Sequence, residues 1–418
     1  MFKIQFNVGM MKEALGILST TVGKNAQNLG DDCISIKDNM DNTISMYTTN
    51  SVEYTKIDMS ITMGMSDASD TVMSPINFTR FNNIINTMPD TEYVTIESGS
   101  SGINISYGLS KSPINLTVST SGMLPFPLAA GTSLKGSGLI SIDPEILKDE
   151  CKAASKIIVP DKSSAINQCM KIEANNYDIS FSAVDTVNNR MMYHKITTGD
   201  LQNGSFFMEP SKVYKILAKI VGKVPMFNTV NIDETTNGSV TIIQGTSLNL
   251  NSNYTGGIIS MTYCLRNVTG NYPNIQPMFA NAKNFVSVPI GNLVTELERV
   301  VSISDSTDAD DVFNMEINNN KITIKKTSQY GSISNDIECN NAVATAKFTD
   351  NFKPKAMLDI LNSCAELQEN GNINIGVTTV NSTDYYIIKT DTDRQQFLIS
   401  GYTLSSSSQS ATAPSQTP

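Results

Sequence analysis

One arrangement of amphipathic helices occurs three times along this chain of 418 residues, and it constrains the fold more than any other feature. Apolar residues recur at the helical spacing of three or four in six segments. The first helix of each repeat is predicted at 10–21, 144–158 and 292–303, and the second at 77–89, 211–223 and 353–367. Equivalent helices are separated by roughly 135 to 145 residues, which is the size of a domain.

A pair of alternating strands follows the second helix of every repeat. The strand pairs are predicted at 91–108, 228–245 and 371–390, and each contains a turn rich in Gly, Ser, Asn or Asp. Alternation of apolar and polar residues is typical of an antiparallel sheet with one buried face. The fold class is therefore α+β, with three domains that each pack two helices on antiparallel sheet.

Turn-rich and linker-like segments mark the predicted domain boundaries. One such segment is "LPFPLAAGTSLKGSG", from Leu124, and the other is "NIQPMFANAKNF", from Asn274. The predicted domains are 1–130, 131–278 and 279–404. The Ser-rich tail, 405–418, is predicted to be disordered because its composition offers no apolar core.

Composition excludes several classes of function. The six cysteines are scattered singly and His194 is the only histidine, so neither a disulfide framework nor a histidine-based metal or catalytic site is expected. No nucleotide-binding, hydrolase or metalloprotease motif occurs. We predict no catalytic residue, no metal and no cofactor. The chain lacks a long apolar run or a signal-like start, so we expect a cytoplasmic protein without a membrane partner.

Lysines gather on two helices of the middle repeat although the formal net charge is -10. Lys148, Lys152 and Lys156 recur every four residues on one helix, and the other carries Lys212, Lys215, Lys219 and Lys223. Apolar residues occupy the opposite face of each helix. A solvated basic face is the simplest interpretation of one such helix, but two in one repeat favour a polyanion whose phosphates are met without reading bases.

Three stretches, taken in order, resemble the bacterial DNA polymerase III beta subunit, the sliding clamp. "RNVTGNYPNIQPMF", from Arg266, is similar to the family's segment between the second and third domains. "LTVSTSGMLPFP", from Leu116, is similar to the end of its first domain. "KAMLDILNSCAELQENGNINIGVTTVNSTDYYIIKT", from Lys355, is similar to its last helix and hairpin. In order and spacing the resemblance covers roughly residues 1–404.

The sequence also departs from the family pattern. The usual T-D-G-H-R-L stretch is replaced by "VDTVNNRMMYHK", from Val184, which keeps Asp185 and Arg190 but loses the Gly-His pair. The family's C-terminal ending is replaced by "SGYTL", from Ser400, followed by the tail. These departures favour a divergent member of the family, encoded by a phage or by an atypical bacterium.

The resemblance implies a function. In the family, head-to-tail dimers of three-domain chains close into a ring whose helices line a channel for duplex DNA, and short peptides of the replicative polymerase and the clamp loader bind the ring. We therefore expect a non-enzymatic DNA sliding clamp, or processivity factor, that encircles double-stranded DNA without sequence preference and forms a homodimer. The alternative is a β-rich repeat structural protein, such as a phage virion component, whose lysines are merely solvated.

The resemblance also assigns sites to this sequence. The channel residues are expected to be Lys148, Lys152, Lys156, Lys212, Lys215, Lys219 and Lys223, with Lys24 and Arg80 from the first domain. The dimer interface is expected at Leu116, Val118 and Ile303. The pocket for partner peptides is expected at Ile166, Val184, Thr186, Met191, Pro273, Pro277, Met278, Leu398, Ile399, Ser400, Gly401 and Tyr402.

Overall fold

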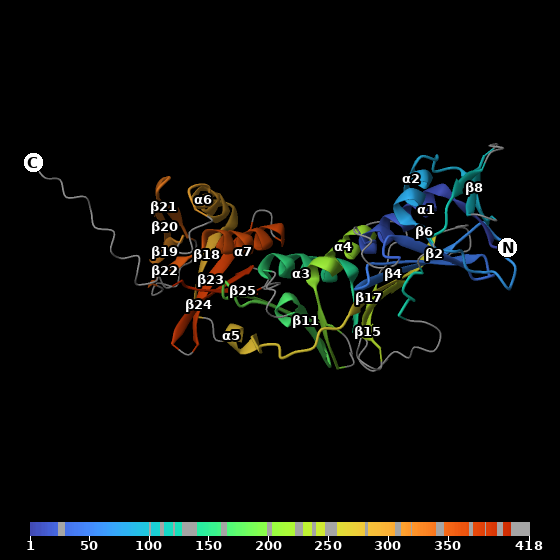
Figure 1. Ribbon diagram of the computed structural model, residues 1–418. Coiled ribbons are helices and arrows are strands. Elements are labelled where there is room, and N and C mark those ends of the chain that lie inside the picture. Colours follow the sequence, from blue (N-terminus) through green and yellow to red (C-terminus); the bar gives the residue numbers. More distant parts are fainter. Residues whose placement is uncertain are drawn as a thin grey trace, which may run out of the picture. The chain divides into compact units, whose positions relative to one another are not determined.

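The protein is described here from a computed structural model, in which the chain forms two compact units (Figure 1). The first unit contains Met1–Lys152, Ala174–Asn176 and Asp200–Thr269, and the second contains Ala153–Glu173, Tyr177–Gly199 and Gly270–Pro418. The structure describes residues 1–23, 30–99, 102–108, 113–119, 122–127, 140–159, 165–198, 203–221, 229–235, 240–246, 257–280, 283–305, 311–318, 320–339, 347–367, 371–380, 382–390 and 396–402.

The helices of the first unit lie on antiparallel sheet. Its helices are α1 (Val8–Leu18), the 3₁₀ turn η1 (Ser19–Thr21), α2 (Phe78–Asn86), most of α3 (Pro144–Ile157) and α4 (Pro210–Ile220). Its strands are β1 (Lys3–Asn7), β2 (Cys33–Asp38), β3 (Thr43–Thr49), β4 (Glu53–Ser60), β5 (Met63–Gly64), β6 (Ile76–Asn77), β7 (Tyr93–Ser98), β8 (Ile103–Tyr107), β9 (Ile114–Leu116), β10 (Ile140–Ile142), β14 (Gly204–Met208), β15 (Val230–Glu234), β16 (Val240–Thr246) and β17 (Ile258–Arg266).

Within the described ranges, two sheets contain all of these strands except β14. The smaller sheet has the order β5-β1-β7-β8-β9, so β9 forms one of its edges. The larger has the order β10-β15-β16-β17-β4-β3-β2-β6. Pairing of β17 with β4, for example Tyr263 opposite Thr55, joins the middle repeat to the first in one continuous sheet. Figure 1 shows α1, α2 and α4 on the same side of this sheet.

The second unit repeats the architecture of helices on antiparallel sheet. Its helices are the 3₁₀ turn η2 (Ile166–Gln168), α5 (Gln276–Ala280), α6 (Ile290–Ser302) and α7 (Pro354–Leu367). Its strands are β11 (Met170–Asn175, whose last residues belong to the first unit), β12 (Asp178–Asp185), β13 (Arg190–Thr197), β18 (Lys283–Pro289), β19 (Phe313–Asn318), β20 (Lys321–Ser328), β21 (Gly331–Glu338), β22 (Lys347–Phe352), β23 (Asn372–Val380), β24 (Thr383–Thr390) and β25 (Gln396–Ser400).

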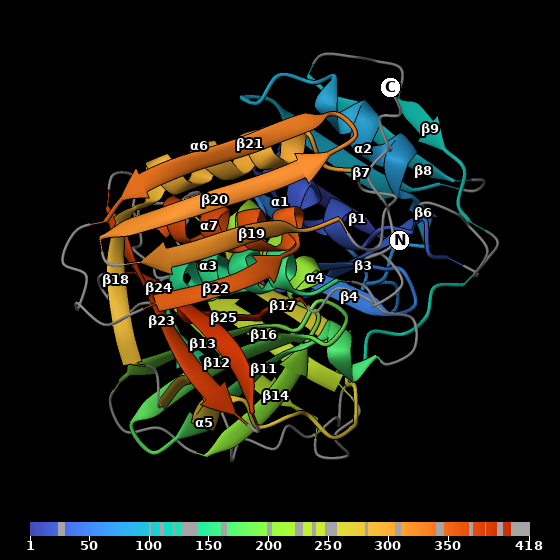
Figure 2. The ribbon, with the colours of Figure 1, turned by 90° about the vertical axis from the view of Figure 1, so that its left-hand side faces the viewer.

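One sheet of the second unit again joins two repeats. Strands β11, β12, β13, β25, β24, β23 and β18 follow one another in it, and β13 pairs with β25 through Arg190 opposite Ile399 and Met191 opposite Leu398. A second sheet has the order β21-β20-β19-β22, which Figure 2 shows side by side. Figure 1 shows α6 and α7 on one side of β23 and β24, and α5 on the other.

The predicted elements are confirmed. All six predicted helices exist as α1, α2, α3, α4, α6 and α7, and the three predicted strand pairs exist as β7–β8, β15–β16 and β23–β24. The division into three domains stays a prediction: its first boundary, 130/131, and the tail, 405–418, lie outside the described residues. Within the described parts of the chain, no helix is long and apolar enough to span a membrane.

Candidate nucleic-acid interface and peptide site

Helix α4 is oriented by its apolar residues. The helix begins with Pro210 at its first position, where a backbone N–H would have no partner within the helix in any case. Val213, Ile216, Leu217 and Ile220 are buried, as their spacing predicts. The lysines, offset from these by one or two residues, must therefore lie on the remaining faces of the helix.

The lysines of α4 are not equivalent. Lys215 and Lys219 are exposed and make no ion pair with any residue that the structure describes. Lys212 is only 27% exposed, and its Nζ lies 2.8 Å from Glu209 Oε2 and 3.4 Å from Glu53 Oε1. Lys215 and Lys219 thus present unneutralised charge to solvent, whereas Lys212 is held by two carboxylates.

Glu53 stands at the centre of the contacts around Lys212. The Tyr263 hydroxyl, which is buried, donates a hydrogen bond of 2.7 Å to Glu53 Oε2. Burial by itself lowers the pKa of Lys212, but hydrogen bonds and charge attraction from Glu209 and Glu53 outweigh it, so the pKa is raised. Lys212 is therefore a cation at neutral pH. These side chains, with Lys215, line a pocket of about 420 Å³.

The lysines of α3 are half-buried. Lys148 and Lys152 lie along the helix, and the Nζ of Lys156 lies 2.6 Å from Glu366 Oε1 of α7.

Three further residues were predicted to line the channel, namely Arg80, Lys24 and Lys223. Arg80 is exposed on α2, whose first turn is capped by the Asn77 side chain. Lys24 and Lys223 lie outside the described residues.

Several predicted pocket residues do come together in one apolar cluster of the second unit. Val184, Met191, Met278 and Leu398 belong to it. Val184 and Leu398 are buried, whereas the flexible side chains of Met191 and Met278 remain partly exposed. The cluster also contains residues that the sequence analysis missed, namely Tyr193, Tyr272, Ile275, Phe279, Phe285, Tyr385 and Ile387.

Aromatic residues give the apolar cluster a fixed shape. The rings of Tyr193 and Phe279 are stacked, with centroids 5.6 Å apart. The Tyr272 hydroxyl donates to the carbonyl of Ser182 at 2.8 Å, which fixes the segment leading into α5 against β12. The spacing of Ile275 and Phe279 by four residues was a sequence signal for these two members, because Ile275 directly precedes α5 and residues four apart lie on the same side of a helical turn.

The remaining predicted pocket residues lie outside the cluster. Ile166 is buried, while Thr186, Pro273 and Pro277 are exposed around the hairpin and α5. Ile399 follows Leu398 in β25 and therefore points to the opposite face of the sheet.

Contacts with residues in and next to β22 hold the end of β25. At Gly401 an added Cβ would lie 1.8 Å from Asp350 Oδ2, so any other residue would displace the Asp350 carboxylate. The backbone N–H of Tyr402 donates to the Asn351 carbonyl at 2.7 Å, and Lys353 lies 4.9 Å from the centre of the Tyr402 ring. Ser400 is buried where β25 ends. These contacts fix the chain beside β22 rather than within the apolar cluster.

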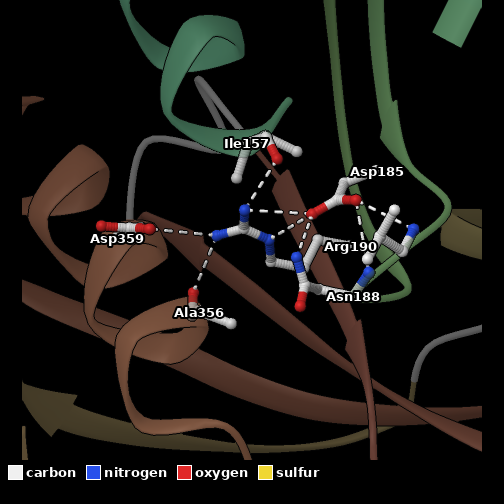
Figure 3. A network of polar contacts seen from close by, with 7 residues as sticks. Ile157, Asp185, Asn188, Arg190, Ala356 and Asp359 are labelled. Atoms are coloured by element: carbon white, nitrogen blue, oxygen red, sulfur yellow. Dashed lines mark hydrogen bonds and ion pairs between the residues drawn. The ribbon is translucent and has the colours of Figure 1, made fainter. Parts of the chain in front are cut away.

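Arg190 occupies the opposite face of the β12–β13 hairpin from Met191. Its guanidinium is 2% exposed and donates to Asp185 Oδ2 at 3.1 Å. It also donates to the Ile157 carbonyl at the end of α3, at 2.9 Å, and to the Ala356 carbonyl and Asp359 carboxylate of α7, at 3.4 and 3.3 Å (Figure 3). A planar fork of five donors satisfies all of these acceptors at once.

The predicted interface residues are distributed as follows. Leu116 lies opposite Ile103 in the edge strand β9 and is only 9% exposed. Val118 forms an isolated bridge with Ile76 and is half-buried. Ile303 is half-buried and ends α6, where its N–H donates to the Val300 carbonyl. Most of the Leu116 surface is thus already covered within its own chain.

Comparisons with known proteins place this fold. No protein-family model matches the chain, and no curated protein matches it. Solved structures match it over nearly its whole length. The DNA polymerase III beta chain of Streptococcus pneumoniae is 17% identical, with a TM-score of 0.78, over 97% of this chain and 100% of that one. A putative DNA polymerase III beta subunit of Eubacterium rectale is 16% identical, with a TM-score of 0.75, over 96% and 99%.

A third similar structure is a sliding clamp, DNA polymerase III subunit beta, of Pseudomonas aeruginosa bound to griselimycin. It is 12% identical, with a TM-score of 0.75, over 96% of this chain and 100% of that one. At such identities the likeness concerns the fold. The α+β fold of this chain is therefore that of the sliding clamps, as the sequence analysis predicted.

Proposed function

We propose that this chain is a DNA sliding clamp that encircles duplex DNA and tethers a replicative polymerase to it. The observation that carries the proposal is the full-length correspondence of fold with DNA polymerase III beta subunits, which spans 96–97% of this chain and 99–100% of theirs. A protein that merely borrowed one domain would match only part of that length.

The proposed contact with DNA is electrostatic and does not depend on sequence. Lys215 and Lys219 present free ammonium groups from a rigid helix, and such groups meet phosphates rather than base edges. A closed ring needs few such contacts, since it holds DNA by topology, and tight contacts would oppose sliding. We infer that the protein performs no chemistry of its own and raises the local concentration of its polymerase at the primer end.

The proposed partner site is the apolar cluster around Met191, Met278 and Leu398. Partly exposed methionine and tyrosine side chains over a buried base suit leucine and phenylalanine anchors of a short extended peptide. The replicative polymerase and the clamp loader would supply these peptides. Ile166, Thr186, Pro273 and Pro277 would form the rim.

The proposed ring is a homodimer of three-domain chains that join head to tail in a bacterial or phage-infected cytoplasm. Strand β9, as the edge of its sheet, would supply one side of the joint, with Leu116 and Val118, and the end of α6, with Ile303, would lie on the other. Such a heterologous contact closes only if the rotation between chains fits the ring.

The proposal is tested by mass and by retention on DNA. Light scattering is expected to give twice the chain mass of 45.4 kDa. After the clamp loader has placed the protein on nicked circular or linear DNA, gel filtration is expected to recover the protein with the circle only. A single-chain mass together with equal recovery on both DNA forms would contradict the proposal.

A further inference from the structure

The contrast between Lys212 and its neighbours on α4 extends the proposed function. Lys212 has two carboxylate partners, Glu209 at 2.8 Å and Glu53 at 3.4 Å, whereas Lys215 and Lys219, one and two turns further along α4, are exposed and have none among the described residues. A count of lysines treats the three as equal. Their electrostatic surroundings differ, because two carboxylates already neutralise the ammonium group of Lys212.

The Glu53 carboxylate is committed to this arrangement. Its side chain is only 9% exposed, and its two oxygens are divided between Lys212 Nζ and the Tyr263 hydroxyl. Glu53 begins β4 and Tyr263 lies in β17, which pairs with β4. The carboxylate is therefore held by the sheet beneath the helix and cannot move aside in the way that the more exposed Glu209 can.

We propose that Glu53 is an internal counterion that withholds Lys212 from the DNA backbone and leaves Lys215 and Lys219 as the phosphate contacts of α4. The inference rests on the proposed function, since it requires that α4 faces DNA. A phosphate that captured Lys212 would leave the buried Glu53 carboxylate without its cation, which is strongly unfavourable. Glu53 thereby limits the grip of the helix on DNA, as a sliding protein requires.

The first experiment compares three single variants of the full chain. Binding to a fluorescein-labelled linear duplex is measured by anisotropy over a series of salt concentrations. The plot of log Kobs against log salt has a negative slope. Lys215→Gln and Lys219→Gln are each expected to make it shallower by roughly 0.9 per lost phosphate contact. Lys212→Gln is expected to leave the slope of the wild type unchanged. An equal reduction by all three variants would overturn the inference.

The same series separates this inference from the proposed function. If none of the three substitutions moves the salt slope, α4 does not meet DNA, and the proposed DNA-facing surface fails with it. If Lys215→Gln and Lys219→Gln act while Lys212→Gln also acts, only the role of Glu53 fails. Thermal unfolding of each variant checks that the helix remains folded.

The second experiment releases Lys212. The double variant Glu53→Gln, Glu209→Gln keeps an acceptor for the Tyr263 hydroxyl and removes both negative charges. Lys212 is then free to contact a phosphate, so the salt slope is expected to become steeper by roughly 0.9. Adding Lys212→Gln to that background is expected to return the slope to the wild-type value. If the increase persisted without Lys212, it would reflect lost repulsion of DNA alone, and the inference would be wrong. Should the double variant fail to fold, the salt slope of the single Lys212→Gln variant still shows whether Lys212 contacts DNA.

Discussion

Helices α4 and α7 occupy equivalent places in their repeats, yet they use charge in opposite ways. Helix α4 carries three lysines and no acid, and two of these lysines face solvent without a partner among the described residues. Helix α7 carries one lysine and two acids. Its Asp359 binds the buried Arg190 and its Glu366 binds Lys156, so the acids of α7 hold other elements in place.

This difference teaches how to interpret an amphipathic helix of a repeat. The apolar stripe is alike in both helices because both must pack on a sheet. The polar face is free to diverge, and its role depends on whether each charge has a partner within the protein. Unpartnered charge points to an external ligand, whereas partnered charge contributes to the structure.

The largest expected effect is the loss of folding stability when the buried ion pair of Arg190 and Asp185 is broken. Replacing Arg190 by Met leaves the Asp185 carboxylate, which is 1% exposed, without its cation, so the free energy of unfolding is expected to fall by about 3–5 kcal/mol. Chemical denaturation measures this change. Arg190→Lys is the matched control and should recover only part of the loss, because an ammonium group lacks the planar fork. A loss below about 1 kcal/mol would show that the network is dispensable.

A second prediction is that the apolar cluster of the second unit binds peptides through apolar side chains, in contrast to the basic side chains of α4. Arginine at both Met191 and Met278, which are partly exposed and so can accept the change, is expected to weaken binding of a polymerase-derived peptide by at least about 2 kcal/mol. Titration calorimetry measures it, with retention on circular DNA as the control. Unchanged peptide affinity would place the site elsewhere.

Charge reversal compares α4 and α7 directly. Lys215→Glu with Lys219→Glu is expected to reduce the salt slope of DNA binding by roughly two units. The free energy of unfolding should change by less than about 0.5 kcal/mol for each exposed substitution. Lys355→Glu on α7 reverses one exposed charge instead of two, so as the control it should change the slope by less than half as much. An equal effect per reversed charge on the two helices would contradict the difference between α4 and α7.

The smallest expected effect is that of the pair between Lys156 and Glu366. Both side chains are partly exposed, so Glu366→Gln is expected to lower the free energy of unfolding by no more than about 1 kcal/mol. Thermal unfolding at low and high salt measures it, and any loss should shrink as salt screens the pair. A loss comparable with that of Arg190→Met would mean that this pair is structural in the same sense.

The sequence predicted the elements well because periodicity is local. The buried residues of α4, from Val213 to Ile220, follow directly from their spacing. It could not separate Lys212 from Lys215, because the distinction depends on Glu53 in a strand far away along the chain. Nor could it show which of Leu398 and Ile399, adjacent in β25 and therefore on opposite faces of the sheet, lies in the apolar cluster, because that depends on how β25 pairs with β13. Met191 and Met278, which the resemblance assigned to one pocket, pack against the same apolar cluster, but the resemblance gave no sign that Leu116 is covered within its own chain.

The central claim, that the protein holds DNA by topology, is tested most directly by cutting the DNA. Protein loaded on a nicked circle is washed at high ionic strength, which weakens phosphate contacts but does not open a closed path. The circle is then cut once with a restriction enzyme, and the protein that remains bound is measured by gel filtration. The proposal predicts retention through the wash and release after the single cut. Loss during the wash, or retention on the cut DNA, would contradict it.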